Sequence, residues 1–348
     1  MKRPLLSPLN PLYAAATALR NALYDREILP ANSLPFPTIS IGNLSAGGTG
    51  KTPLVLALTQ LLSNAGRFPV ILSRGYGRQS SHIARVDPAG DVAQFGDEPL
   101  LLARSSQAPV FVGPDRYQVG LFAAQSFAAQ SQPLPPETIF LLDDGFQHRR
   151  LAPDANIVLL SASDLTDVLL PAGNLREPHR SLSRADILVF TEPDAALAPD
   201  FLDLFKRPSC GRPVLWTLRR SLDLSQLPPT SRPLAFAGIA RPEEFFSSLR
   251  AASDPAHNLA PASTLAFPDH HRYSPADLTR ITSAATEAHA DLLLTTEKDL
   301  VRLTRAARAQ LSAAAPLHAV PLRTQLLNPD RCLQHLFALC AAKSPSRP

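Results

Sequence analysis

Residues Ser40 to Thr52 read SIGNLSAGGTGKT, and the fold class follows from this segment. A strand-like apolar segment, residues 36–41, leads into it, and an apolar segment with helical spacing, residues 54–62, follows. A strand, a glycine-rich turn and a helix that opens on Gly-Lys-Thr are typical of the phosphate-binding loop of P-loop NTPases. Glycines let successive backbone N–H groups point at one anion, and the helix N-terminus adds partial positive charge. The sequence therefore predicts binding of ATP or GTP at this turn.

The loop departs from the strict pattern Gly-x₄-Gly-Lys-[Ser/Thr] at one position, where Ser45 replaces the first glycine. The alternative is an ordinary glycine-rich turn, but Gly-Lys-Thr falls at the predicted boundary between strand and helix. The Lys51 amine can reach the β- and γ-phosphates, and the Thr52 hydroxyl can ligate Mg²⁺. The residues expected to contact the nucleotide here are Ser45, Ala46, Gly47, Gly48, Thr49, Gly50, Lys51 and Thr52.

The composition favours a two-domain protein that does not bind nucleic acid. A chain of 348 residues is long for one core, and 45% of its residues are hydrophobic. The net charge is only +4, without a block of Lys and Arg interleaved with aromatic residues. We expect neither a cleavable signal peptide nor a membrane-spanning segment, and no obligate protein partner is inferred. The cysteines lack metal-ligand spacing, which favours buried thiols in a reducing compartment, at Cys210, Cys332 and Cys340.

Residues 8–29 predict an amphipathic helix. Its apolar residues recur near helical spacing, and positive charges lie at its start and along it. One interpretation places the helix in a membrane interface, with its cations near anionic headgroups. The other packs it on the protein's own core. The apolar positions are Leu9, Leu12, Tyr13, Ala16, Leu19 and Leu23, and the cations are Lys2, Arg3, Arg20 and Arg26.

Two polar segments follow the second and third predicted elements. A buried strand at residues 69–73 runs into Arg74-Gly75-Tyr76-Gly77-Arg78, at the end of a strand where α/β sheets bind ligands. Arginines there suit an anionic group, although a glycine turn with solvated arginines would look the same. Gly96-Asp97-Glu98-Pro99 opens a predicted helix, where acids are favoured by the helix dipole alone.

A second strong signal lies at residues 138–149, which read TIFLLDDGFQHR. An apolar strand that ends in acid is the Walker B arrangement, in which a carboxylate holds Mg²⁺ directly or through water. Asp143 and Asp144 are both candidates, and the sequence does not assign one of them. The alternative is a buried strand followed by turn acids.

The remaining pattern predicts an α/β fold in two parts. Strands are expected at residues 156–160 and 186–190, and the segment 171–178 between them reads only as a loop. Strand–helix alternation resumes after a Ser/Pro-rich stretch at 219–233. We expect a P-loop parallel sheet with helices on both faces and a smaller C-terminal α/β domain. The boundaries are residues 1–29 for the interfacial helix, 30–225 and 226–341 for the two domains, and 342–348 for a frayed tail.

Together these motifs resemble one family, tetraacyldisaccharide 4′-kinase, the lipid A 4′-kinase of Gram-negative bacteria. The matching stretches run in the family's order from about residue 36 to residue 300, and the Ser at position 45 is usual for it. They are Gly42-Asn43-Leu44 and Gly47 to Pro53, Ser73 to Gly77, Gly96 to Pro99, Asp143 to Arg149, Leu175-Arg176-Glu177, Ala237-Gly238-Ile239, Phe267 to His271, and Thr295 to Asp299. Asn174, before Leu-Arg-Glu, departs from the expected pattern, which bears on loop shape.

The resemblance implies transfer of the γ-phosphate of ATP, with Mg²⁺, to the 4′-hydroxyl of a lipid-linked glucosamine disaccharide 1-phosphate, giving lipid IVA. Such a substrate stays in the inner membrane. The resemblance therefore favours the membrane interpretation of the first helix and a peripheral, monotopic location on the cytoplasmic face of that membrane.

The resemblance also implies roles for individual residues. Asp97 is the candidate base, and His270 from the second domain orients or tunes it, beside Lys51 at the phosphates. Placing base and partner on different domains would complete the site only on closure. Arg74, Tyr76, His148 and Arg176 would face the disaccharide and its 1-phosphate. Thr296, Glu297 and Lys298 would approach the nucleotide from the second domain.

Two other functions share the P-loop and the Walker B acid. A nucleotide-switch ATPase or GTPase, such as an assembly factor, would not need Asp97, His270 or the arginines at 74–78. A P-loop kinase of a soluble small molecule would not need the N-terminal helix. ATP turnover with and without a lipid A disaccharide precursor distinguishes these classes.

Overall fold

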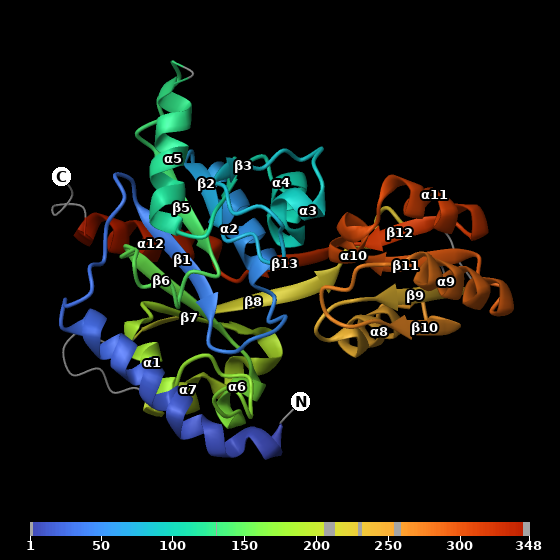
Figure 1. The fold of residues 1–348 in the computed structure, drawn as a ribbon, viewed down its shortest axis with the longest axis horizontal. Helices are drawn as coiled ribbons and strands as arrows, with labels where there is room; N and C mark the ends of the chain where they lie inside the picture. Colours follow the sequence, from blue (N-terminus) through green and yellow to red (C-terminus); the bar gives the residue numbers. More distant parts are fainter. Residues whose placement is uncertain (1–2, 130, 205–212, 229–231, 254–258, 344–348) are drawn as a thin grey trace.

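The structure is a computed structural model that describes residues 3–129, 131–204, 213–228, 232–253 and 259–343. It has two α/β parts, a larger one built from about the first two-thirds of the chain together with its C-terminal segment, and a smaller one at the right of Figure 1. Lys2 and Cys210, both named in the sequence analysis, lie outside the described residues. Cys332 and Cys340 are buried, as expected.

The larger part is a nine-stranded sheet within the described residues, in the order β13-β8-β7-β6-β1-β5-β2-β4-β3. Neighbouring strands are parallel except at the two edges, where β13 pairs antiparallel with β8 and β3 with β4. Because β1, β5 and β2 are parallel neighbours, their carboxyl ends meet at one edge of the sheet. The strands are β1 Thr38–Asn43, β2 Phe68–Ser73, β3 Ala84–Arg85, β4 Val110–Val112, β5 Thr138–Asp143, β6 Ala155–Leu160, β7 Ile187–Thr191, β8 Val214–Leu222 and β13 Leu322–Leu326.

Helices cover both faces of this sheet, as the sequence predicted. Side chains alternate between faces along a strand. In β5, Ile139 and Leu141 join the core under α2, α4 and α12, whereas Phe140 and Leu142 join the core under α5. The helices of this part are α1 Asn10–Asp25, α2 Lys51–Asn64, α3 Val92–Phe95, α4 Asp97–Ser105, α5 Arg116–Ala129, α6 Ala162–Thr166, α7 Ala198–Leu204 and α12 Pro329–Lys343, with 3₁₀ turns η1 Pro4–Leu9, η2 His179–Arg184 and η3 Glu192–Leu197.

The smaller part, as far as the structure describes it, is a four-stranded parallel sheet in the order β10-β9-β11-β12, also covered on both faces. Its strands are β9 Pro233–Ala237, β10 Ser263–Ala266, β11 Leu292–Thr296 and β12 Leu317–Val320. Its helices are α8 Pro242–Ala251, α9 Pro275–Glu287, α10 Glu297–Arg302 and α11 Arg305–Ala314. Ser274 and Asp277 form a capping box at the start of α9, so the helix predicted from Ser274 is present.

The expected second domain, residues 226–341, differs from the structure at its C-terminal end. The chain leaves the small sheet after β12 and returns to the large one, where β13 pairs with β8 (Figure 1). α12 then buries Cys332, Leu336 and Cys340 in the core that holds α2. These residues recur every four positions, which gives α12 one apolar stripe that packs on the face of the large sheet that α2 also covers. The helix runs to Lys343, so residues 342 and 343 are not frayed as expected.

The N-terminal helix does not bury its leucines in the protein's own core. Leu5, Leu9, Leu12 and Leu19 are exposed by 94, 50, 72 and 64%, whereas the polar Thr17 and Asn21 are buried. The core interpretation is therefore wrong for this face of α1, which lies along the large part at the lower left of Figure 1. Among the helices of the described residues, none has the length and apolar character needed to cross a bilayer.

Candidate active site

The P-loop follows β1 and leads into α2, as predicted. Asn43, the last residue of β1, donates to the Ser45 carbonyl at 2.7 Å and to the Thr49 hydroxyl at 2.9 Å. Lys51 is the first residue of α2, and its amine donates to Asn43 Oδ1 at 2.9 Å. Gly50 has a φ of +87°, and a Cβ there would lie 2.2 Å from a guanidinium nitrogen of Arg220. The loop is thus held in place by side chains beneath and beside it.

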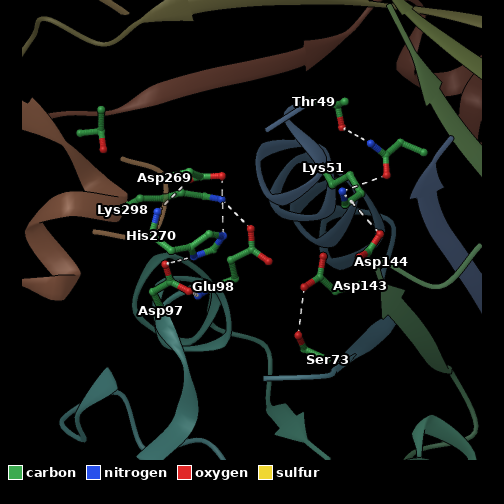
Figure 2. Close-up of polar contacts among 12 residues, drawn as sticks. Thr49, Lys51, Ser73, Asp97, Glu98, Asp143, Asp144, Asp269, His270 and Lys298 are labelled. Atoms are coloured by element: carbon green, nitrogen blue, oxygen red, sulfur yellow. Dashed lines mark hydrogen bonds and ion pairs between the residues drawn. The ribbon is translucent and has the colours of Figure 1, made fainter. Parts of the chain in front are cut away.

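Asp143 and Asp144, which the sequence could not tell apart, have different surroundings. Asp143 is buried at the end of β5 and accepts from the Ser73 hydroxyl at 3.0 Å. Burial and the negative charges of Glu98 and Asp144 raise the pKa of Asp143 to about 7. Asp144 lies 3.4 Å from the Lys51 amine (Figure 2). Burial opposes the charge of Asp144, but Lys51 and Arg176 outweigh it and lower its pKa to about 2.

Asp97 and His270 meet, as the resemblance implied. His270 lies in the loop after β10, and its Nδ1 atom is 2.8 Å from Asp97 Oδ2 at the start of α4. The Asp97 side chain is only 5% exposed. Burial disfavours its charge, but the hydrogen bond from His270 and the charge of Arg302 outweigh burial and hold its pKa well below the ordinary value. Figure 2 shows this pair on one side of the site and Lys51, Asp143 and Asp144 on the other.

The three residues expected to approach the nucleotide from the small part have protein partners in this structure. The Lys298 amine lies 2.5 Å from Glu98, next to Asp97 (Figure 2). The Thr296 hydroxyl caps α10 and bonds to Asp299 at 2.6 Å. Glu297 accepts a hydrogen bond from the Leu322 backbone, and burial raises its pKa.

The residues expected to face the disaccharide lie in and behind the turns that follow the strands. Tyr76 is 63% exposed, and its ring lies 5.3 Å from that of His270. Arg176 pairs at 2.7 Å with Asp144, the same carboxylate that lies 3.4 Å from the Lys51 amine. Burial and the neighbouring charge of Arg116 lower the pKa of His148 to about 4. Arg74 contributes to the same cationic surroundings.

The segment 171–178, which read only as a loop, connects the P-loop to the N-terminal helix. The backbone N–H of Ala46 donates to the Asn174 carbonyl at 2.7 Å. Glu177 is fully buried and binds Arg20, Asn21 Nδ2 at 3.3 Å and Arg184 at 2.6 Å. The polar face of α1 is therefore fixed to the segment that carries Arg176, and its leucines face outward.

Sequence reasoning missed three arginines at the site. Arg302 donates to Asp97, Arg220 donates to the Thr49 carbonyl at 2.7 Å, and Arg116 is buried near Asp143 and Asp144. Arg302 follows the Thr-Thr-Glu-Lys-Asp segment by three residues, which was the one available signal. Nothing local marks Arg220, whose partner Thr49 is 171 residues away, and the bond from Arg116 to the nearby Pro114 carbonyl gives no sign of Asp143 and Asp144.

Comparison with known proteins gives one consistent result. A family model described as tetraacyldisaccharide-1-P 4′-kinase matches residues 2–341. A tetraacyldisaccharide 4′-kinase of Koribacter versatilis is 41% identical over 342 residues, covering 96% of this chain and 98% of its own. A protein with the same description from Aquifex aeolicus is 36% identical over 317 residues, covering 87% of this chain and 90% of its own.

A solved structure is similar over nearly the whole chain. It is described as the "apo" form of LpxK from Aquifex aeolicus in complex with ATP, and it covers 97% of this chain and 99% of its own. The TM-score is 0.73 and the sequence identity 31%. The similarity therefore includes both sheets and the segments that connect them.

Proposed function

This chain belongs to the tetraacyldisaccharide-1-P 4′-kinase family, and from that premise we propose how its residues carry out the reaction. It is a phosphotransferase of lipid A biosynthesis that uses ATP to phosphorylate the 4′-hydroxyl of a tetraacylated disaccharide 1-phosphate. A nucleotide switch and a kinase of a soluble molecule gain no support, because the family match extends through both sheets. The residue roles below are our proposals.

The P-loop residues 45–52 hold the phosphates of ATP. Their backbone N–H groups and the first turn of α2 provide the anion site. In this structure the Lys51 amine donates to Asn43 and pairs with Asp144. When ATP binds, the amine moves to the β- and γ-phosphates. Thr296, Glu297 and Lys298 contact the nucleotide from the small part. Preformed donors of this kind stabilise the transferring phosphoryl group, where charge is spread over three oxygens.

The donor set fits Mg²⁺. Asp143 is buried near two further carboxylates, and burial together with their negative charge raises its pKa, which a bound cation would lower. Thr52 is also buried at the start of α2, and Asp144 faces the P-loop lysine. The described residues hold no cage of three or more His, Cys, Asp or Glu side chains, which suits an ion that keeps several waters and binds phosphates. Mg²⁺ held by Thr52, Asp143 and Asp144 would neutralise the phosphate charge.

Asp97 accepts the proton of the sugar hydroxyl. As the 4′-oxygen bonds to the γ-phosphorus, its proton moves to the Asp97 carboxylate, and the bond from that phosphorus to the β–γ bridging oxygen breaks to release ADP. His270 orients the carboxylate through their 2.8 Å contact. General-base help of this kind is worth about 10²–10⁴-fold. A weakly basic carboxylate is adequate, because the hydroxyl becomes acidic only as its bond to phosphorus forms.

The lipid enters from a membrane surface. Exposed leucines of α1 and η1 lie in the interface at the cytoplasmic face of the inner membrane, and cations of the same segment meet anionic headgroups. Arg74, Tyr76, His148 and Arg176 face the disaccharide and its 1-phosphate. Glu177 binds Arg20 and Asn21 of α1 and directly follows Arg176. The membrane-binding helix and the substrate-binding arginine are therefore held by the same buried side chain.

The observation that carries this function is the Asp97–His270 contact beside a P-loop in a chain that matches the family throughout. The test is product formation from ATP, Mg²⁺ and detergent-solubilised tetraacyldisaccharide 1-phosphate. The purified protein should yield a bisphosphorylated lipid, and K51A, which lacks the phosphate-binding amine, should not. K343A, changed at the end of α12, is the matched control. Absence of product from the unaltered chain would contradict the function.

A further inference from the structure

Arg302 donates two hydrogen bonds to Asp97. It is the last residue of α10, and its side chain is 3% exposed. Its Nε and Nη2 atoms donate to Asp97 Oδ2 at 2.8 and 2.5 Å. The two residues come from different sheets, so this ion pair joins the two parts of the protein at the proposed base.

The small part holds Arg302 independently of Asp97. Its Nη1 atom donates to the Gly238 carbonyl at 2.5 Å and to Asp299 Oδ1 at 3.2 Å. Asp299 is itself fully buried and accepts from the Gly238 N–H at 3.0 Å and the Tyr273 hydroxyl at 2.9 Å. The guanidinium therefore has a fixed direction set by β9, α10 and the loop before α9.

The two oxygens of Asp97 are used unequally. Oδ2 receives both Arg302 donors and His270 Nδ1. Within the described part of the chain, the hydrogen bond recorded for Oδ1 is the one from the Glu98 N–H, at 3.0 Å. A carboxylate has about four lone-pair sites. Oδ2 is thus filled, and Oδ1 keeps room for another donor.

We infer that Arg302 is a positioning residue for phosphoryl transfer, which clamps Oδ2 of Asp97 together with His270 and leaves Oδ1 to receive the proton of the 4′-hydroxyl. The inference rests on the proposed role of Asp97. The O–H bond breaks toward Oδ1, the 4′-oxygen keeps the electron pair and bonds to phosphorus, and ADP leaves with the bridging oxygen. Two donors of the planar Arg302 guanidinium converge on Oδ2 and hold its position, and a single ammonium group does not reproduce this pair of bonds.

The charges around Asp97 give this clamp a measurable signature. Arg302, Lys298 and Asp299 face it from α10, His270 and Asp269 from the loop after β10, and Glu98 from α4 itself. Asp97 accepts a proton only when ionised, and Arg302 favours the ionised form. Replacing the guanidinium by a neutral amide should therefore raise the pKa of Asp97 and move the acidic limb of the kcat–pH profile to higher pH.

The experiment compares R302Q and R302K with the unaltered enzyme, at saturating ATP and solubilised lipid across the pH range. R305Q, changed at an exposed residue of α11, is the matched control. R302Q should lose at least about tenfold in kcat, keep its KM for ATP within about twofold, and shift the acidic limb upward by about one pH unit or more. R302K should leave the limb in place and still lose kcat. R305Q should match the unaltered enzyme.

A folded R302Q with an unmoved acidic limb would overturn the inference, because a residue that only stabilises the fold scales the profile without shifting it. Should R302Q fail to fold, R302K decides alone, and unaltered kcat in R302K overturns the inference. D97N, assayed in parallel, separates the two proposals. If D97N loses kcat while R302Q does not, Arg302 has no positioning role and the base assignment stands. If D97N retains kcat, the base assignment fails and the inference fails with it.

Discussion

His270 Nδ1 lies 2.8 Å from Asp97 Oδ2, a contact between residues 173 positions apart that belong to different parts of the molecule. Asp97 sits at the first turn of α4, on the large part, and His270 in the loop after β10, on the small part. The pair links the two halves of the molecule at the carboxylate proposed to act as the base. Each half alone would lack a complete site.

The contact makes stability depend on pH. The hydrogen bond with Asp97, and its negative charge, raise the pKa of His270 above 6.5 although burial opposes this. A raised folded-state pKa stabilises the protein fully below the unfolded value, and this stabilisation is lost as pH rises through the folded value. The gap in unfolding free energy between the unaltered protein and H270Q should therefore be larger near pH 6 than near pH 9. Urea unfolding at both pH values measures it, with exposed His82, changed in H82Q, as control. Equal gaps would argue against a charged pair.

G50A tests the P-loop geometry. Gly50 has a φ of +87°, and its Cβ would meet Arg220 Nη2 at 2.2 Å and Cζ at 2.6 Å. Arg220 must then leave the Thr49 carbonyl, so we expect the KM for ATP to rise at least about tenfold. G66A is a matched control, because Gly66 also has a positive φ, +73°, but nothing within 4 Å of the added methyl. G66A should cost about 1–2 kcal/mol of stability from backbone strain, with unaltered kinetics. Equal changes in the KM for ATP in G50A and G66A would contradict a role for Arg220 in holding the P-loop.

E177A tests the connection between α1 and the substrate loop. Glu177 is fully buried and binds Arg20, Asn21 and Arg184. Removing one partner of a buried ion pair leaves uncompensated charge, at a cost of about 3–5 kcal/mol. Thermal unfolding should show this loss. E192A, which breaks the exposed pair with Arg219, should leave the unfolding temperature almost unchanged, because solvent screens that pair. Similar losses in both variants would contradict a buried anchor.

L12S and L19S test the membrane surface. Both leucines are exposed, by 72 and 64%, so their replacement should leave stability within about 0.5 kcal/mol. Loss of apolar area in the interface should weaken binding to vesicles with anionic lipid. Vesicle co-sedimentation measures the effect, and L322S, changed at an exposed leucine of β13, is the control. Unchanged binding by the double variant L12S/L19S would leave this face without a membrane role.

Local signals predicted the parts of the site that are continuous in sequence. The strand, glycines and lysine of the P-loop and the strand ending at Asp143 need only neighbouring residues to be read. The fold class followed from strand–helix alternation. By contrast, the return of β13 and α12 to the large sheet depends on the pairing of β13 with β8, about 100 residues earlier in the chain. Arg323 of β13 also binds Asp223, which directly follows β8. The domain boundary therefore could not be read from composition.

Arg302 and Arg220 were not predicted for the same reason, because their partners are distant in the sequence. Arg302 and Arg220 act on Asp97 and Thr49 from segments 205 and 171 residues away. In an arginine-rich chain, residue type alone does not single them out. The direction of α1 is a different case, since an amphipathic pattern shows that one face is apolar but not which neighbour covers it.

The role of the Asp97 carboxylate as acceptor of the 4′-hydroxyl proton is measured by kcat of D97N at saturating ATP and lipid. The amide keeps the shape of the side chain and cannot take the proton. We predict a fall in kcat of at least about 10²-fold with a KM for ATP within about threefold. A kcat of D97N within about twofold of the unaltered enzyme would contradict the assignment of Asp97 as the proton acceptor.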